Sequence, residues 1–130
     1  MEAVLISRLA KLHKDARCCV KDFRQTKEAL HQKDEFAQAL QILTALAHEQ
    51  RLAIVKLVQQ YGELCACEIE ASFDLSHSTV IHHLNLLTEA GILETRKDGK
   101  WSYYRLSKAL SSRLQAVVEF LGAKRVRSVR

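Results

Sequence analysis

The chain has four cysteines in two pairs: Cys65 and Cys67 in the stretch ELCACEI, and the adjacent Cys18 and Cys19. Cysteine thiolates bind soft metal ions and can also act as redox groups. Residues i and i+2 lie about 200° apart around a helix, so Cys65 and Cys67 converge only if Cys65 precedes a helix and Cys67 lies in its first turn. We expect that placement, with the helix N-terminus stabilising the thiolates. The plainer alternative is that Cys65 is a small core residue and Cys67 is incidental.

The composition sets the context for these thiols. The chain has 130 residues, of which 48% are hydrophobic and 27% charged, as expected for one soluble globular domain. No apolar run approaches the roughly 20 residues that a membrane span needs, and the N-terminus lacks the apolar core of a signal peptide. We therefore expect a cytoplasmic protein with no membrane partner. Since cytoplasmic thiols are kept reduced, the cysteines indicate ligands or redox groups and not structural disulfides.

The formal net charge of +5 is unevenly distributed. Basic residues exceed acidic ones at both ends of the chain and over residues 76–108, whereas residues 34–75 carry two basic and seven acidic side chains. This distribution is a weak signature of a protein that binds a polyanion, and an ordinary solvated surface would look similar.

Apolar residues at helical spacing predict three amphipathic helices, and a further apolar stretch over residues 52–58 ends near Tyr61 and Gly62. The stripes near the two ends are too broad to be covered by one small core, so we expect the terminal helices to form a dimer interface. The three stripes are Leu5, Leu9, Leu12 and Ala16; Phe36, Leu40, Leu43, Leu46 and Ala47; and Leu110, Leu114, Val117, Val118 and Leu121.

Residues 67–91 have the form of a helix-turn-helix. CEIEASF predicts a short helix, residues 74–76 a turn, and HSTVIHHLNLLTEAG a second helix that Ser76 or Ser78 caps and Gly91 ends. Val80, Leu84 and Leu87 share its inner face, with His83 packing or hydrogen-bonding at the core edge. The polar outer face suits the major groove of DNA. The residues predicted to read bases are His77, Ser78, Thr79, Ile81, His82 and Asn85.

The segment ILETRKDGKWSYYRL predicts a β-hairpin that turns at Asp98-Gly99. Two opposed lysines would repel at its tip, so we expect a hairpin poorly suited to its own stability and well placed to reach phosphates. A helix-turn-helix followed by a basic hairpin is a winged helix. Arg96, Lys97 and Lys100 are predicted to contact phosphates or the minor groove. In the predicted register Lys97 faces Lys100, Arg96 faces Trp101, and Leu93 faces Tyr104.

The run from ELCACEI through STVIHHLNLLTEAGIL to RKDGKWSYYRLS closely resembles the ArsR/SmtB family of metal-sensing repressors. The resemblance covers about residues 36–122, and TALAHEQRLAIVKLV is similar to the preceding helix pair of that family. The chain departs from the family at Glu49-Gln50, where a Pro, Asn or Asp usually precedes the equivalent of Arg51; this blurs the helix boundary and leaves the fold intact.

The resemblance implies a mainly α fold with a β-hairpin wing, a winged helix-turn-helix homodimer that sits on operator DNA and leaves it when metal binds. The implied domain organisation is an N-terminal helical extension over residues 1–33 that carries Cys18 and Cys19, a winged helix-turn-helix domain with a C-terminal dimerisation helix over residues 34–122, and a basic tail over residues 123–130.

The resemblance also gives the cysteines a role. In the branches that sense soft ions, an N-terminal extension brings cysteines to the ELCxC helix, often from the opposite subunit. The implied metal ligands are Cys18, Cys19, Cys65 and Cys67, although adjacent residues point in different directions on a helix and one of the first two could be the only close ligand. An all-thiolate site selects As(III)/Sb(III), which favour three sulfurs, or Cd(II)/Pb(II), which accept three or four.

Similarities and differences between this chain and the branches of the family bear on which ion it binds. The wing is more similar to the arsenic branch, but that branch often has a third cysteine where this chain has Glu70, so Cys18 or Cys19 would have to supply the third sulfur. The paired N-terminal cysteines resemble the cadmium/lead branch, which leaves arsenite narrowly ahead. Zinc and nickel members of the family bind their metal on the last helix. The corresponding positions in this chain fall near Lys108, Leu110, Leu121 and Lys124, whose side chains are not suitable metal ligands.

Three other functions are weighed against a metal-released repressor. A redox- or persulfide-responsive thiol switch would keep the DNA binding. A thiol oxidoreductase is disfavoured because the chain has no CxxC and no acid/base constellation around the cysteines, so we expect no enzyme. A winged helix that binds only proteins is disfavoured by the polar outer face and the basic wing.

Overall fold

The computed structural model describes residues 2–9 and 16–122. The chain divides into two compact units, one through Phe36 and one from Ala37 onward. The first unit contains α1 (Glu2–Leu9) and α2 (Ala16–His31), which contact each other. The backbone of Cys18 and Cys19 lies in α2. Leu12 of the predicted N-terminal stripe and the basic tail at 123–130 fall outside the described residues.

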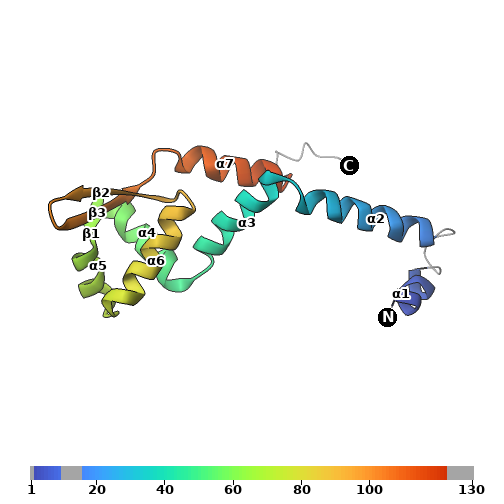
Figure 1. The fold of residues 1–130 in the computed structure, drawn as a ribbon, viewed down its shortest axis with the longest axis horizontal. Helices are drawn as coiled ribbons and strands as arrows, with labels where there is room; N and C mark the ends of the chain where they lie inside the picture. Colours follow the sequence, from blue (N-terminus) through green and yellow to red (C-terminus); the bar gives the residue numbers. More distant parts are fainter. Residues whose placement is uncertain (1, 10–15, 123–130) are drawn as a thin grey trace. The chain divides into compact units, whose positions relative to one another are not determined.

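The second unit is a winged helix-turn-helix (Figure 1). After α3, which begins in the first unit, the elements follow in the order helix, strand, two helices, hairpin and helix, and this confirms the predicted mainly α fold with a β-hairpin wing. The bounds are α3 (Asp34–Leu46), α4 (Glu49–Tyr61), β1 (Glu63–Cys65), α5 (Ala66–Phe73), α6 (His77–Glu89), β2 (Leu93–Asp98), β3 (Trp101–Leu106) and α7 (Leu110–Phe120).

Local capping explains where the two helices of the helix-turn-helix begin and end. α5 ends at Asp74, whose φ of 52° is left-handed, a conformation that Asp tolerates better than most side chains. The Ser76 hydroxyl then accepts a hydrogen bond from the backbone N–H of Thr79 at 3.3 Å and starts α6. Gly91, with φ of 73°, comes after Ala90, the C-cap of α6, and turns the chain toward β2. The predicted turn and both helices are confirmed, with Ser76 as the cap.

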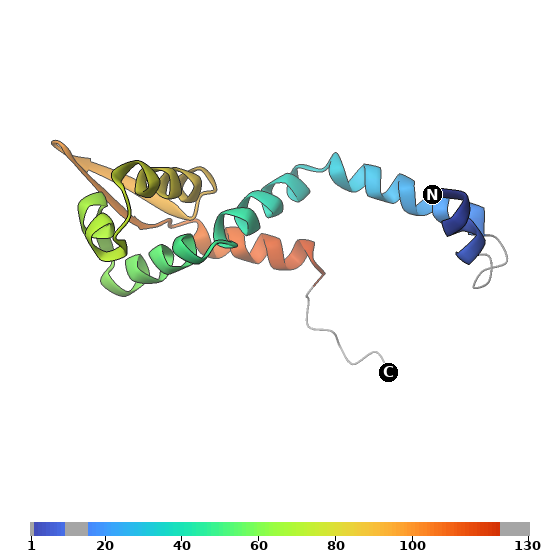
Figure 2. The ribbon, with the colours of Figure 1, turned by 90° about the horizontal axis from the view of Figure 1, so that it is seen from below.

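The hairpin belongs to a three-stranded antiparallel sheet in the order β1-β3-β2, and its turn projects from the second unit (Figures 1 and 2). The predicted register is wrong by two residues: Asp98 pairs with Trp101, Lys97 with Ser102, Arg96 with Tyr103, and Leu93 with Leu106. Gly99, with φ of 60°, is the first central residue of the turn, the position at which a two-residue hairpin of type II′ requires glycine.

The observed register separates the two lysines that were expected to repel. It places Glu94 opposite Arg105, with 3.2 Å between a carboxylate oxygen and the guanidinium Nε. Arg96 lies over the ring of Tyr103 at 4.6 Å from its centroid. Cross-strand pairs of opposite charge, and cations over aromatic rings, stabilise hairpins. The wing is therefore better suited to its own stability than the sequence suggested.

The core lies between α4, α5, α6 and the sheet. Its largest fully buried side chains are Ile54, Val58, Ile69, Val80, Leu84, Leu87, Ile92 and Leu93. Val80, Leu84 and Leu87 thus face inward as predicted. In α3 the buried residues are Ala39, Ile42 and Ala45, whereas Leu40 and Leu43 of the predicted stripe are exposed. In α7 only Val117 is buried, and Leu114, Val118 and the following Leu121 are exposed.

Candidate DNA interface and thiol site

The outer face of α6 carries most of the polar side chains predicted to read bases. His77, Ser78, His82 and Asn85 are exposed, and Thr79 is half-buried beside the Ser76 cap, with 2.8 Å between the two hydroxyl oxygens. Ile81 differs, because it is half-buried and packs against the core. His83 faces the other way and is buried, as expected for the second of two adjacent histidines.

Of the three basic wing residues, Arg96 is already engaged. Its Nη2 and Nε atoms donate to the two carboxylate oxygens of Glu63 in β1, at 2.6 and 3.3 Å. This pair lowers the pKa of Glu63, and the Arg96 hydrogen bond is the largest cause. Lys97 and Lys100 are exposed at the tip, with the Lys100 ammonium 5.3 Å from the centroid of the Trp101 ring. The two lysines are therefore better placed than Arg96 to meet a polyanion.

The two cysteines of ELCACEI lie where the sequence predicted. Cys65 ends β1 and is the N-cap of α5, and Cys67 lies in the first turn of that helix. Cys65 is buried and Cys67 is exposed. The backbone N–H of Glu68 donates to the Cys65 sulfur at 3.4 Å, and the Cys65 N–H donates to the Glu68 carboxylate at 3.1 Å. This reciprocal pair is a capping box with a thiol in the place of the usual hydroxyl.

The expected stabilisation of the Cys65 thiolate is not found. Burial raises the pKa of the Cys65 thiol, and the hydrogen bond with the Glu68 carboxylate raises it further. The Glu68 N–H acts in the opposite direction and is outweighed. A carboxylate beside a buried sulfur therefore opposes the helix dipole, and Cys65 is a thiol in the free protein.

Several residues that join these parts were not identified from the sequence. Glu70, on the same helix as Cys67, is hydrogen-bonded to the ring of His77 at the start of α6. Glu63 joins β1 to the wing, and Glu68 completes the cap. Glu68 could have been found, because a glutamate three residues after an N-cap is the capping-box spacing. Glu63 pairs with Arg96, 33 residues away, and Glu70 pairs with His77 across the turn between two helices, and neither spacing is a known sequence pattern.

The structure brings Cys65 and Cys67 into one turn, and the place of the other two predicted ligands stays a prediction. The side chains of Cys18 and Cys19 are outside the described part of the chain. Among the described residues, no group of three or more His, Cys, Asp or Glu side chains could hold a metal ion. No described helix is long and apolar enough to cross a membrane.

Comparison with known proteins places this geometry in a family. Residues 48–95 match the model of the bacterial regulatory protein family arsR. A solved structure described as a possible transcriptional regulator for arsenical resistance is 35% identical, with a TM-score of 0.56, over 63% of this chain and 84% of that one. The chain belongs to the ArsR family.

Two relatives of this ArsR-family chain have named roles. The arsenical resistance operon repressor of Escherichia coli is 46% identical over 72 residues, which are 55% of this chain and 62% of that protein. The cadmium resistance transcriptional regulatory protein CadC of Listeria innocua is 44% identical over 59 residues, which are 45% of this chain and 50% of CadC. The chain thus spans only part of the length of each.

Proposed function

We propose that this chain is a homodimeric transcriptional repressor that binds operator DNA and is released when a thiophilic ion binds its cysteine thiolates. The observation that carries the proposal is the position of Cys65 and Cys67 at the start of α5, the helix directly before the recognition helix α6. The names of the two relatives above support resistance to arsenicals or cadmium as the setting.

DNA reading is assigned to the exposed face of α6 and the wing. His77, Ser78, Thr79, Ile81, His82 and Asn85 would meet base edges, while Arg96, Lys97 and Lys100 would contact phosphates or the minor groove. Ile81 would offer only its exposed part, and Arg96 would have to share its guanidinium with Glu63.

Dimerisation would bury apolar side chains that one chain leaves in water. Leu114 and Val118 of α7 and the neighbouring Leu121 are 38%, 41% and 63% exposed, and Leu40 and Leu43 of α3 are 55% and 43% exposed. Stripes this apolar at helical spacing are typical of a partner surface. The contribution of the extension over residues 1–33 is proposed from the family resemblance alone.

The inducer would be a soft ion, with As(III)/Sb(III) ahead of Cd(II)/Pb(II). Cys65 and Cys67 supply two sulfur donors from one turn, which fits part of a three-thiolate site, and Cys18 or Cys19 would supply the third. Because the pKa of the Cys65 thiol is raised, this residue must give up a proton when the ion binds. With Cd(II) or Pb(II) the proton goes to the solvent, so the response should strengthen as the pH rises, whereas As(OH)3 gives up its hydroxides with the thiol protons as water and its response should depend less on pH.

Two contacts lead from β1 and α5, the elements that meet at the cysteines, to the DNA-binding parts. Glu70 reaches His77 at the start of α6, and Glu63, two residues before Cys65, holds Arg96 of the wing. Rearrangement of the first turn of α5 would thus act on both parts at once. Linkage requires that the ion bind the DNA-free protein more tightly than the operator complex.

The test is release of an operator duplex, selected from random-sequence DNA, by titration of the reduced protein with arsenite, cadmium, lead and zinc. Cys65→Ser and Cys67→Ser should bind the operator and fail to leave it. Cys65→Ser is well matched, because a serine hydroxyl keeps the helix cap. Loss of both Cys18 and Cys19 should weaken the response with DNA affinity nearly unchanged.

Sulfur-to-metal charge-transfer absorption under reducing conditions separates the proposal from a redox or persulfide switch. Release by oxidant or persulfide without any such absorption would favour the thiol switch. A response of the Cys18 and Cys19 double variant that equals that of the wild type would remove the extension from the sensor.

A further inference from the structure

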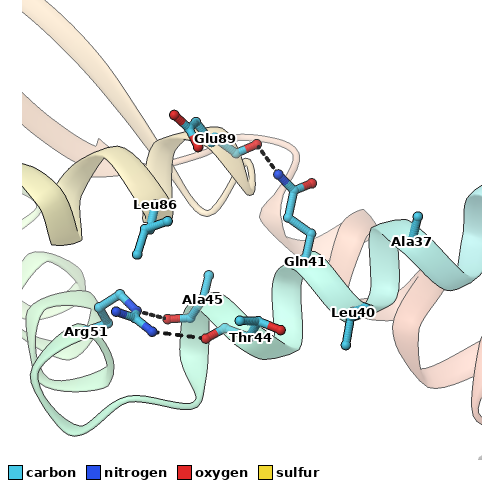
Figure 3. Close-up of a pocket in the computed structure, with 8 residues that line it drawn as sticks. All are labelled: Ala37, Leu40, Gln41, Thr44, Ala45, Arg51, Leu86 and Glu89. Carbon is cyan, nitrogen blue, oxygen red and sulfur yellow. Dashed lines mark hydrogen bonds between the residues drawn. The ribbon is translucent and has the colours of Figure 1, made fainter.

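A buried polar contact joins the inner face of α6 to the end of α3. Arg51 in α4 is 9% exposed and His83 in α6 is 6% exposed. Arg51 Nη1 lies 3.2 Å from His83 Nδ1. The same guanidinium donates from Nε to the carbonyl of Ala45 at 2.7 Å and from Nη2 to the carbonyl of Thr44 at 3.2 Å (Figure 3). One side chain thus holds the last turn of α3 and the middle of α6 together.

The chemistry of this contact fixes the state of His83. A guanidinium can only donate hydrogen bonds, so Nδ1 of His83 must accept and cannot carry a proton. The single ring proton then lies on Nε2, and the imidazole is neutral. Protonation at Nδ1 would remove the acceptor and place a second positive charge beside Arg51.

The surroundings of His83 also disfavour its charged form. Burial is the largest cause of its lowered pKa, followed by His48, Arg51 and His82. The ring of His48, the N-cap of α4, is 4.7 Å away between centroids, and that of His82 is 5.8 Å away. All three groups that act on His83 are basic, so among the described residues no acidic group compensates an imidazolium there.

Ala39, Ile42 and Ala45 pack α3 on the core, but the packing between α3 and α6 is incomplete. A pocket of about 310 Å³ lies between them, and Gln41 crosses its edge to donate to the carbonyl of Glu89 at 3.4 Å (Figure 3). An open pocket provides few interlocking contacts, so the polar bonds at its two ends add to the core packing in fixing how the two helices lie. The pocket is lined by Ala37, Leu40, Gln41, Thr44, Ala45, Arg51, Leu86 and Glu89.

We propose that Arg51 is a positioning residue for DNA recognition, whose bond to neutral His83 fixes α6 relative to α3. This inference rests on the proposed DNA binding and deepens it. Since α3 carries an exposed apolar stripe of the proposed dimer, the bond would transmit the dimer geometry to the reading helix of each subunit. Two half-sites can be met together only if the two reading helices keep a fixed spacing.

The sign of the pH dependence follows from the lowered pKa. In the unfolded chain a histidine binds its proton near pH 6.5, whereas folded His83 does so only at lower pH. Acid therefore favours states in which His83 has left Arg51, and the contribution of the bond weakens as the pH falls from about 6.5 toward the lower pKa of folded His83. Protonation of an exposed histidine on the DNA-facing side would act oppositely, because it adds a positive charge beside phosphates.

The experiment compares operator affinity between about pH 7.5 and about pH 5.5 for the wild type, His83→Asn and His83→Leu. The Asn side-chain oxygen can stand near Nδ1 and accept from Arg51 without titrating. Over this range the wild type should lose about tenfold more affinity than His83→Asn. His83→Leu should be weaker by roughly tenfold at every pH, because it leaves Arg51 Nη1 unpaired. His82→Asn, which alters the adjacent exposed ring assigned to DNA reading, should lower the affinity at both pH values and keep the acid-induced loss.

A measurement on the wild type covers the case in which a His83 variant fails to fold. Imidazole ¹⁵N shifts should show the Nε2–H form of His83 at neutral pH and a pKa below 6.5. An Nδ1–H form, or a pH profile of folded His83→Asn that equals that of the wild type, would overturn the inference and leave the proposed function intact. A wild-type protein that binds no selected DNA at neutral pH would overturn both.

Discussion

The two ends of the recognition helix are held in different ways. At its start, His77 is 74% exposed at the side chain and contacts Glu70 of α5, which carries the cysteine pair. Over its second half, His83, Leu84, Leu87 and the following Ala90 are buried, and Arg51 and Gln41 tie it to α3 and α4. The first turn, before the buried Val80, contacts the helix of the proposed sensor, and the second half contacts α3 and α4, of which α3 carries an exposed stripe of the proposed dimer.

This difference bears on how the proposed repressor would be switched. An exposed ion pair typically contributes about 0–1 kcal/mol, whereas removal of one partner from a buried polar contact costs more. A ligand at α5 would therefore act on the weakly held start of α6. The strongly held second half would keep the position of each α6 fixed relative to the proposed dimer interface. Variants at each end test this division.

The largest effect is expected at the buried end. Arg51→Met removes the donors that satisfy two carbonyls of α3 and the ring of His83, and should lower the free energy of unfolding by about 2–4 kcal/mol. Urea unfolding followed by circular dichroism measures the change. Lys56→Met is the matched control on the same helix, because Lys56 is exposed, and it should stay within about 0.5 kcal/mol. A loss below about 1 kcal/mol for Arg51→Met would show that the second half of α6 is not held by this contact.

An intermediate effect is expected at the cap of α5. Cys65→Ala removes the acceptor of the Glu68 N–H and should cost about 1 kcal/mol, while Cys65→Ser should recover most of this loss. Thermal unfolding under reducing conditions gives both values, with Cys67→Ala as a neighbour that caps nothing. Equal stability of the Ala and Ser variants would mean that burial of the sulfur, and not capping, determines the role of Cys65.

The helix-turn-helix could be predicted because its signals are local. The Ser76 cap, Gly91 and the spacing of Val80, Leu84 and Leu87 lie within one stretch of the chain. The hairpin register could not, because a slip of two residues leaves every side chain on the same face of the sheet, so the apolar pattern fits both registers. The like-charge contact at the tip of the predicted register was itself a reason to prefer the observed one.

Long-range contacts account for the other differences. The stripe that contains Leu40 and Leu43 predicted an amphipathic helix without saying what covers it, because a sequence pattern does not distinguish a core face from a partner face. In α3 the smaller Ala39 and Ala45 are buried with Ile42. At the site, the position of Cys65 followed from helix geometry, while the raised pKa depends on its burial and on Glu68. The Arg51–His83 contact joins residues 32 apart in sequence and had no local signature.

The smallest effect on stability is expected at the exposed end, where the effect on signalling should be selective. Glu70→Gln keeps a hydrogen-bonding side chain and should change the free energy of unfolding by no more than about 0.5 kcal/mol. If α5 moves the start of α6 through this contact, the ion should bind with unchanged affinity while its release of the operator weakens by roughly two- to threefold. Charge-transfer absorption measures the affinity for the ion, and fluorescence anisotropy of labelled operator measures the release.

Glu89→Gln is the matched control at the other end of α6, since only the backbone carbonyl of Glu89 takes part in the contact with Gln41. If both variants lost the same amount of operator release, the two ends of α6 would not differ in their roles. Removing the contact with α5 would then matter no more than removing a surface charge at the far end of the helix.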